Sequence, residues 1–263
     1  MTAVDVAFDD EGVRGDTVPV LLSASLGTTR TMWAEQVHRL AATRRVIAYD
    51  HRGHGDSPVP ADDLSLTDLV DDVVALLDRL DVAQVDVVGV SLGGTVGLGL
   101  ATARPDRVRT LVTINSPVFA DAPDFWRQRA AAVRAQGMGV ASAGLLGRWY
   151  SPTVAAAPSA LVRDTVDTVD RLSPAGYAAC CAAIAGTDLR EALPALAVPL
   201  LAVTGSADAV VPAHHAELLA DSVPGARRVE VAGAGHLLPQ ERPDELHALL
   251  TQHWTTTSTR STR

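Results

Sequence analysis

The stretch "VVGVSLGGTVGL", Val87–Leu98, passes from β-branched residues into a glycine-rich segment through one serine, Ser91. Nearly continuous β-branched runs are typical of strands buried on both faces. Gly89–Gly93 match the pattern G-x-S-x-G, a sharp turn from strand to helix that exposes the serine hydroxyl. The flanking glycines are needed because side chains there would collide with neighbouring elements. The stretch therefore predicts a nucleophilic serine between a buried strand and a helix.

The composition indicates a globular protein with one α/β core, since 47% of the 263 residues are hydrophobic and 20% are charged. The net charge of -9 argues against nucleic-acid binding, because a phosphate-binding surface needs a basic face. We expect a soluble cytoplasmic protein with no membrane contact, since the sequence has neither a signal-like start nor a run of about 18 apolar residues. The adjacent Cys180 and Cys181 are expected to stay reduced.

Short apolar runs alternate with longer amphipathic segments, which predicts an α/β fold with a mostly parallel central sheet and helices on both faces. The expected strands are residues 18–25, 44–50, 85–90, 108–115, 198–205 and 226–233. The expected helices are residues 31–42, 65–80, 92–104, 213–222 and 241–254, the second of them behind a Ser65 cap.

This alternation stops between residues 117 and 190, a segment rich in alanine with no convincing strand. We expect four short helices there, forming a helical cap inserted into a core made of residues 1–116 and 191–254. Residues 255–263 are polar and low in complexity, and we expect them to be disordered.

A serine hydroxyl is a weak nucleophile at neutral pH, so it needs a histidine base that an acidic group orients. In this fold the chain order is serine, acid, histidine. His236 follows the last expected strand in "VAGAGHLLP", and Asp208 follows the strand before it in "GSADAVVP". The preceding core strand ends in "INSP", which offers no carboxylate. Ser91, Asp208 and His236 are therefore the expected catalytic residues.

The other histidines after Ser91 are expected on solvated helix faces: His214, His215, His247 and His253. The glycine-rich stretch "YDHRGHGDS", residues 49–57, carries His51 and His54, but no third ligand is suitably spaced. We therefore predict no metal site.

Acyl transfer also needs N–H donors for the developing oxyanion. One is expected from Leu92, directly after the serine, and the other from Leu26 in the turn "SLGT" that follows the first expected strand.

The motifs "SLGT", "YDHRGHGDS", "GVSLGG", "GSADAVVP" and "GAGH" together resemble the α/β-hydrolase superfamily over residues 4–254. Within it the chain is most similar to 3-oxoadipate enol-lactonases, through "SLGTTRTMW" (25–33), "WRQRAAAVRAQG" (126–137) and "SPAGYAACCAAIAGTDLR" (173–190). The resemblance implies a cofactor-free serine hydrolase that opens an enol-lactone in aromatic catabolism. A carboxylesterase or carbon–carbon bond hydrolase on the same scaffold stays open, as does, more remotely, a slow-turnover ligand receptor.

Residues 117–190 hold seven arginines against six aspartates, whereas the rest of the chain carries an excess of acidic residues. A comparatively basic lid over an acidic body favours an anionic lactone or ester as the small-molecule partner. The candidate substrate-binding residues are Trp126, Arg127, Arg134, Arg148 and Trp149. The oligomeric state stays open.

Overall fold

The structure is a computed structural model that describes residues 2–258. Its centre is a seven-stranded sheet in the order β1-β3-β2-β4-β5-β6-β7. The strands are β1 (Phe8–Gly12), β2 (Val20–Ser23), β3 (Arg45–Tyr49), β4 (Val85–Val90), β5 (Val108–Ile114), β6 (Leu200–Gly205) and β7 (Arg227–Val231). The six strands from β2 to β7 run parallel to one another, so the predicted mostly parallel sheet is confirmed.

The edge strand β1 was not predicted. It pairs antiparallel with β3, with Phe8 opposite Tyr49 and Gly12 opposite Arg45. Its sequence "FDDEG" is polar because one face of this edge strand meets solvent, so it lacks the apolar run that identifies the other strands. Asp10 accepts hydrogen bonds of 2.9 and 2.8 Å from the Arg45 guanidinium across the pair.

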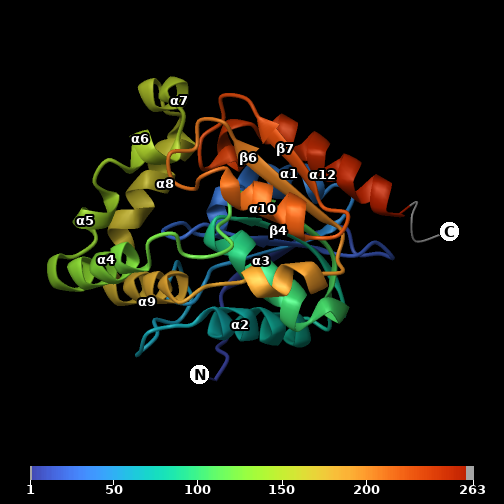
Figure 1. The fold of residues 1–263 in the computed structure, drawn as a ribbon, viewed down its shortest axis with the longest axis horizontal. Helices are drawn as coiled ribbons and strands as arrows, with labels where there is room; N and C mark the ends of the chain where they lie inside the picture. The colour runs from blue at the N-terminus through green and yellow to red at the C-terminus, as the bar shows by residue number, and fades with distance from the viewer. Residues whose placement is uncertain (1, 259–263) are drawn as a thin grey trace.

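Helices cover both faces of the sheet, as predicted (Figure 1). On one face α1 (Ala34–Leu40) packs against α12 (Pro243–Ser258), and the short helices η1 (Arg30–Trp33) and α11 (Leu238–Glu241) join them. The other face carries α2 (Leu66–Arg79), α3 (Leu92–Ala103), η2 (Pro105–Arg107), η3 (Arg190–Ala195) and α10 (His214–Ser222). Ser65 caps α2 as expected, accepting a hydrogen bond from the Asp68 N–H.

Between β5 and β6 the chain forms a helical insert, residues 117–190, to one side of the sheet (Figure 1). Its helices are α4 (Pro123–Gln136), α5 (Gly139–Ser142), α6 (Leu145–Trp149), α7 (Pro152–Ala156), α8 (Ala160–Arg171) and α9 (Pro174–Ala185). These six helices, in a range that the structure describes completely, correct the predicted four. The helices α5, α6 and α7 have only four or five residues, which is too short to show a helical period in sequence.

The two ends of the helical insert lie side by side. Phe119 and Asp188 form an isolated antiparallel bridge, and the Leu189 N–H donates to the Val118 carbonyl at 3.0 Å. The helix α4 follows Phe119 in the chain and α9 precedes Asp188, and these two helices pack against each other. Cys180 and Cys181 on α9 are buried and free, as predicted.

The expected disorder of residues 255–263 is wrong for 255–258, because α12 continues through Ser258. Hydroxyls on this last turn donate to the carbonyls four residues back, Thr255 to Thr251 at 2.9 Å and Thr257 to His253 at 2.7 Å. Residues 259–263 lie outside the described residues. Among residues 2–258, no helix combines the length and hydropathy needed to cross a membrane.

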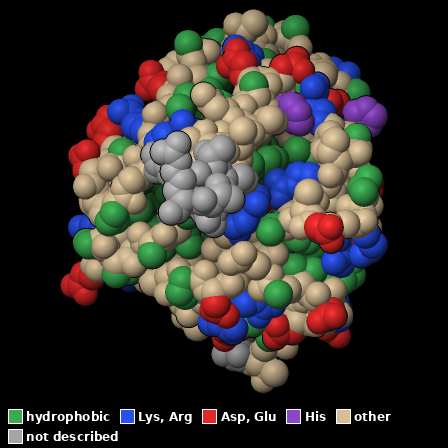
Figure 2. Space-filling model, turned by 90° about the vertical axis from the view of Figure 1, so that its right-hand side faces the viewer, with side chains coloured by type: hydrophobic (Ala, Val, Ile, Leu, Met, Phe, Trp, Pro, Cys, Tyr) green, Lys and Arg blue, Asp and Glu red, His purple; other side chains and the backbone are tan. Residues whose placement is uncertain are grey.

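The end of the molecule opposite the helical insert is rich in arginine side chains, which gather in a hollow there (Figure 2). At the amino ends of the central strands the fully buried Asp86 pairs with Arg44 and Arg109. The Thr110 hydroxyl donates to the same carboxylate at 2.8 Å. Removing one partner of such a buried pair leaves an uncompensated charge, so this cluster fixes the starts of β3, β4 and β5 against one another.

Candidate active site

Ser91 stands between β4 and α3 with a left-handed backbone, at φ 54° and ψ -120°. A non-glycine residue with positive φ is strained, and such strain persists only where the surrounding structure fixes it. A Cβ added to Gly89 would lie 2.4 Å from the Gly93 backbone, and one added to Gly93 would lie 2.1 Å from the Ser23 carbonyl oxygen. Both flanking glycines are therefore required by close backbone packing, as the sequence predicts.

His236 and Asp208 come together from two loops at the carboxyl edge of the sheet. The His236 ring Nδ1 lies 3.0 Å from Asp208 Oδ2, and both side chains are almost fully buried. An ionised carboxylate only accepts hydrogen bonds, so Nδ1 carries the proton and Nε2 keeps its lone pair. Asp208 is itself held by backbone donors, since its Oδ1 accepts from the Val210 N–H at 2.7 Å.

Ser91 and His236 line the same cavity, which has a volume of about 330 Å³. Within the described part of the chain the Ser91 hydroxyl has no hydrogen-bond partner, so it can rotate toward the imidazole without breaking a contact. Catalytic hydrogen bonds are often long in the absence of substrate and shorten in the complex. The cavity therefore brings together a free hydroxyl and an imidazole whose unprotonated nitrogen can accept its proton.

Leu92 follows Ser91 directly in the chain, and Leu26 lines the same cavity as Ser91. Leu92 is the first residue of α3, so its N–H has no acceptor inside the helix. Leu26 lines the cavity from a four-residue turn in which the Thr28 N–H donates to the Ser25 carbonyl at 3.1 Å. Gly27 in this turn has φ +83°, the value that a type II turn requires at its third residue. These are the two N–H groups that the sequence predicts as oxyanion donors.

Three of the five candidate substrate-binding residues line the cavity: Trp126, Arg148 and Trp149. Arg127 and Arg134 do not. Arg127 pairs with Asp124 on the exposed face of α4, and Arg134 pairs with Asp63. The structure thus corrects the prediction for these two arginines, which lie on the solvent side of their helix.

Arg129 lines the cavity and was not predicted. It lies three residues after Trp126, which places both on one face of α4, and this spacing was the available signal. Its Nε donates to the Tyr177 hydroxyl at 2.8 Å and its Nη2 to the Ala141 carbonyl at 3.0 Å. Arg148 Nη2 donates to the same Ala141 carbonyl at 3.2 Å.

The two cavity arginines therefore lie close together, and neither pairs with a carboxylate of the described residues. Burial, together with the charge of Arg129, lowers the pKa of Arg148. Two guanidinium groups without an acidic partner leave an excess of positive charge in the cavity wall, which an anion can compensate.

The chain matches the family described as alpha/beta hydrolase fold over residues 18–243. It belongs to the α/β-hydrolase family. The hydrolase is 32% identical to 3-oxoadipate enol-lactonase 2 of Acinetobacter baylyi over 92% of this chain and 91% of that protein. It is also 31% identical, over 90% and 91% of the two chains, to an Azorhizobium caulinodans protein that bears the name carbamate hydrolase RutD.

A solved structure, the enol-lactonase from Burkholderia xenovorans, superposes with a TM-score of 0.90 at 33% identity, covering 95% of this chain and 96% of that one. The predicted resemblance to the α/β-hydrolases and to enol-lactonases is confirmed. The protein is an enzyme, a hydrolase of the kind that acts on ester bonds.

The hydrolase places His215 and His253 in buried positions, so the prediction of solvated side chains is wrong for both. His215 lines the cavity, where its Nε2 lies 2.8 Å from Asp121 and its Nδ1 accepts from the Val118 N–H at 3.3 Å. His253 is covered where α12 packs on the sheet, and burial lowers its pKa to about 4.

Asp121, His214 and His215 offer ligand atoms that all lie within 4.8 Å of one another. A neutral imidazole has one lone pair and one N–H. Because Nδ1 of His215 is the acceptor for Val118, its Nε2 carries the proton and donates to Asp121. Hydrogen bonding among the three side chains thus accounts for the cluster without an ion.

Asn115 is a site residue that sequence reasoning missed. It follows β5 with φ 47°, and its buried side chain accepts from the Gly205 N–H at 2.9 Å. Its Nδ2 donates to the carbonyls of Gly235 and His236 at 3.0 and 2.9 Å. It therefore ties the strand before Asp208 to the loop of His236. The signal was available, because Asn115 is the only asparagine in the chain and asparagine tolerates a left-handed backbone.

Replacing Asn115 by Ala should lower kcat by ~10²-fold, because a shift of about 1 Å in a catalytic group costs that much. Steady-state kinetics and a urea unfolding curve measure the effect. Thr110→Ala is the matched control, since it removes a buried hydrogen bond at the other end of the same strand and should keep kcat. Equal kcat values for the two variants would contradict the positioning of His236 by Asn115.

Proposed function

We propose that this hydrolase opens a lactone ring by acyl-enzyme chemistry on Ser91, with an anionic enol-lactone, 3-oxoadipate enol-lactone, as its substrate in aromatic catabolism. The observation that carries the proposal is the cavity itself. It joins Ser91 and the His236–Asp208 pair to two arginines that pair with no carboxylate of residues 2–258. The similarity to two named enol-lactonases supports the same substrate class.

In the proposed reaction, His236 Nε2 takes the Ser91 proton as the hydroxyl attacks the lactone carbonyl. The N–H groups of Leu26 and Leu92 stabilise the oxyanion of the tetrahedral intermediate. Its collapse breaks the bond to the ring oxygen, which receives the proton from His236 while the opened chain stays bound as an ester of Ser91. His236 then activates water, and hydrolysis of this ester releases the acid and restores the serine.

The free carboxylate of such a substrate, the one not closed into the lactone ring, is proposed to bind Arg129 and Arg148. Trp126, Trp149 and Tyr177 also line the cavity, and an apolar wall with few polar groups suits a small ring. We propose that residues 117–190 act as the cap that carries these groups, over a core of residues 1–116 and 191–254. In this arrangement the cap recognises the anion and the core performs the chemistry.

Ser91→Ala should lower kcat by ~10⁴-fold or more, because removing the nucleophile leaves only binding and oxyanion stabilisation. The decrease of the enol-lactone's ultraviolet absorbance measures turnover, and urea unfolding shows whether the fold is retained. Ser142→Ala is the control and should keep full activity, because Ser142 is a half-buried residue of α5 that does not line the cavity. A Ser91→Ala protein with the rate of the unaltered protein would refute the proposal.

Arg129→Gln and Arg148→Gln should each lower kcat/KM on the anionic lactone by ~10- to 100-fold, because a hydrogen bond to a charged group contributes roughly 1.5–3 kcal/mol. Both variants should keep kcat/KM on the neutral ester p-nitrophenyl acetate. Arg127→Gln and Arg134→Gln are matched controls on the outer face of α4. If all four variants kept the same ratio of lactone to ester activity, the anion would be bound elsewhere and a carboxylesterase function would be favoured.

A further inference from the structure

The loop of residues 50–57 contains two buried histidines that the proposed mechanism does not use. His51 and His54 are only 1% and 0% exposed. Burial lowers the pKa of His51 to about 4 and that of His54 to about 3. Both rings are therefore neutral at neutral pH, and each offers one donor and one acceptor nitrogen.

Three consecutive contacts join this loop to the turn that presents Leu26. The Gly27 N–H donates to His54 Nε2 at 3.0 Å, and His51 Nε2 lies 2.9 Å from the Ala24 carbonyl oxygen. The Arg30 N–H donates to Asp50 Oδ1 at 2.7 Å. The loop therefore holds the backbone on both sides of Leu26.

These contacts fix the two rings in opposite tautomers. A carbonyl oxygen only accepts, so His51 carries its proton on Nε2. An N–H only donates, so His54 Nε2 is unprotonated and its proton lies on Nδ1, which faces the Arg52 carbonyl at 3.4 Å. A buried N–H at Gly27 without this acceptor would be unsatisfied, which costs free energy.

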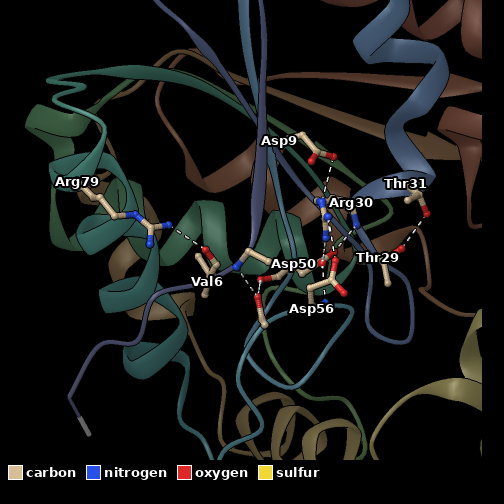
Figure 3. Close-up of polar contacts among 10 residues, drawn as sticks. Val6, Asp9, Thr29, Arg30, Thr31, Asp50, Asp56 and Arg79 are labelled. Atoms are coloured by element: carbon tan, nitrogen blue, oxygen red, sulfur yellow. Dashed lines mark hydrogen bonds and ion pairs between the residues drawn. The ribbon is translucent and has the colours of Figure 1, made fainter.

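The loop itself is rigid, as the contacts of Asp50 show (Figure 3). The Asp56 N–H donates to Asp50 Oδ2 at 3.1 Å, and the Ser57 hydroxyl donates to the Asp50 carbonyl at 2.8 Å. Arg30, which follows the Leu26 turn in the chain, donates from its guanidinium to the carboxylates of Asp50 and Asp56. A Cβ added to Gly53 would lie 2.4 Å from the Gly176 backbone, so α9 also limits movement of the loop.

We propose that His54 and His51 are positioning residues that aim the Leu26 N–H at the oxyanion, His54 as acceptor for Gly27 and His51 as donor to Ala24. The inference rests on the proposed serine hydrolase function. It assigns to the "YDHRGHGDS" motif a part in transition-state stabilisation, exerted through the backbone of the neighbouring turn. An oxyanion donor must sit close to the place where negative charge develops, so its orientation matters for kcat more than for substrate binding.

The test compares His54→Phe, which keeps a ring but removes the acceptor, with His54→Gln, whose carbonyl oxygen restores it. His253→Phe is the matched control, because it replaces another buried histidine on α12, away from the cavity. Each protein is assayed for kcat and KM on p-nitrophenyl acetate and on the enol-lactone, and for inhibition by a trifluoromethyl ketone, which forms an oxyanion on the serine. Urea unfolding gives the stability of each variant.

His54→Phe should lower kcat by ~10²- to 10³-fold with KM unchanged. The inhibition constant of the trifluoromethyl ketone should rise by a similar factor, because the ketone depends on the same oxyanion contacts. His54→Gln should regain most of this loss, and His253→Phe should lose stability but keep kcat. If His54→Phe kept the kcat of His253→Phe, or if the ketone bound both equally, His54 would have only a structural role and the inference would be overturned.

A second measurement uses the unaltered protein and therefore does not depend on whether a variant folds. Nitrogen-15 NMR of histidine-labelled protein reports the tautomer of each ring, and we expect Nδ1–H for His54 and Nε2–H for His51. The opposite tautomer at His54 would overturn the inference. Failure of the proposed function has a different signature, an active Ser91→Ala protein, and the ester assay tests the positioning role even if the lactone is not a substrate.

Discussion

The backbone of Ser91 is held at φ 54° and ψ -120°, a conformation that costs about 1–3 kcal/mol for a residue with a side chain. Backbone hydrogen bonds on both sides of the residue maintain this conformation. The Ser91 N–H donates to the Ile114 carbonyl at 2.9 Å, and the Thr95 N–H donates to the Ser91 carbonyl at 3.0 Å. Ser91 lines the cavity and α3 begins at the next residue, so the same turn fixes the proposed nucleophile and one of the two proposed oxyanion donors.

The remaining groups reach the cavity because parallel strands end at one edge of the sheet. The loops after β6 and β7 carry Asp208 and His236, and Asn115 at the end of β5 links both loops. The turn after β2 presents Leu26, and the loop after β3 holds that turn. The proposed reacting groups therefore come from the strands and loops of the sheet, whereas Arg129 and Arg148 come from the helical insert.

Short sequence patterns predicted most of the fold and also indicated Ser91, Asp208 and His236, the residues proposed to react. Buried parallel strands and the turn at Ser91 depend on contacts that short sequence patterns report, because every residue there is constrained by packing. The edge strand β1 was not predicted, because a strand with an exposed face can be polar and then lacks the apolar run that identifies a buried strand. Whether a single side chain faces the cavity or the solvent was harder to predict. Arg129 enters the cavity and Arg127 does not, although both lie on α4, because the packing of α4 against α9 decides which face turns inward.

The central claim is that Ser91 forms an ester whose oxyanion lies between two backbone N–H groups. A crystal structure of the protein treated with a serine-directed phosphonate ester tests it most directly. We predict phosphorus bonded to Ser91 Oγ, with the phosphonyl oxygen about 2.7–3.1 Å from the nitrogens of Leu26 and Leu92. An adduct on another residue, or a phosphonyl oxygen turned away from both nitrogens, would contradict the account.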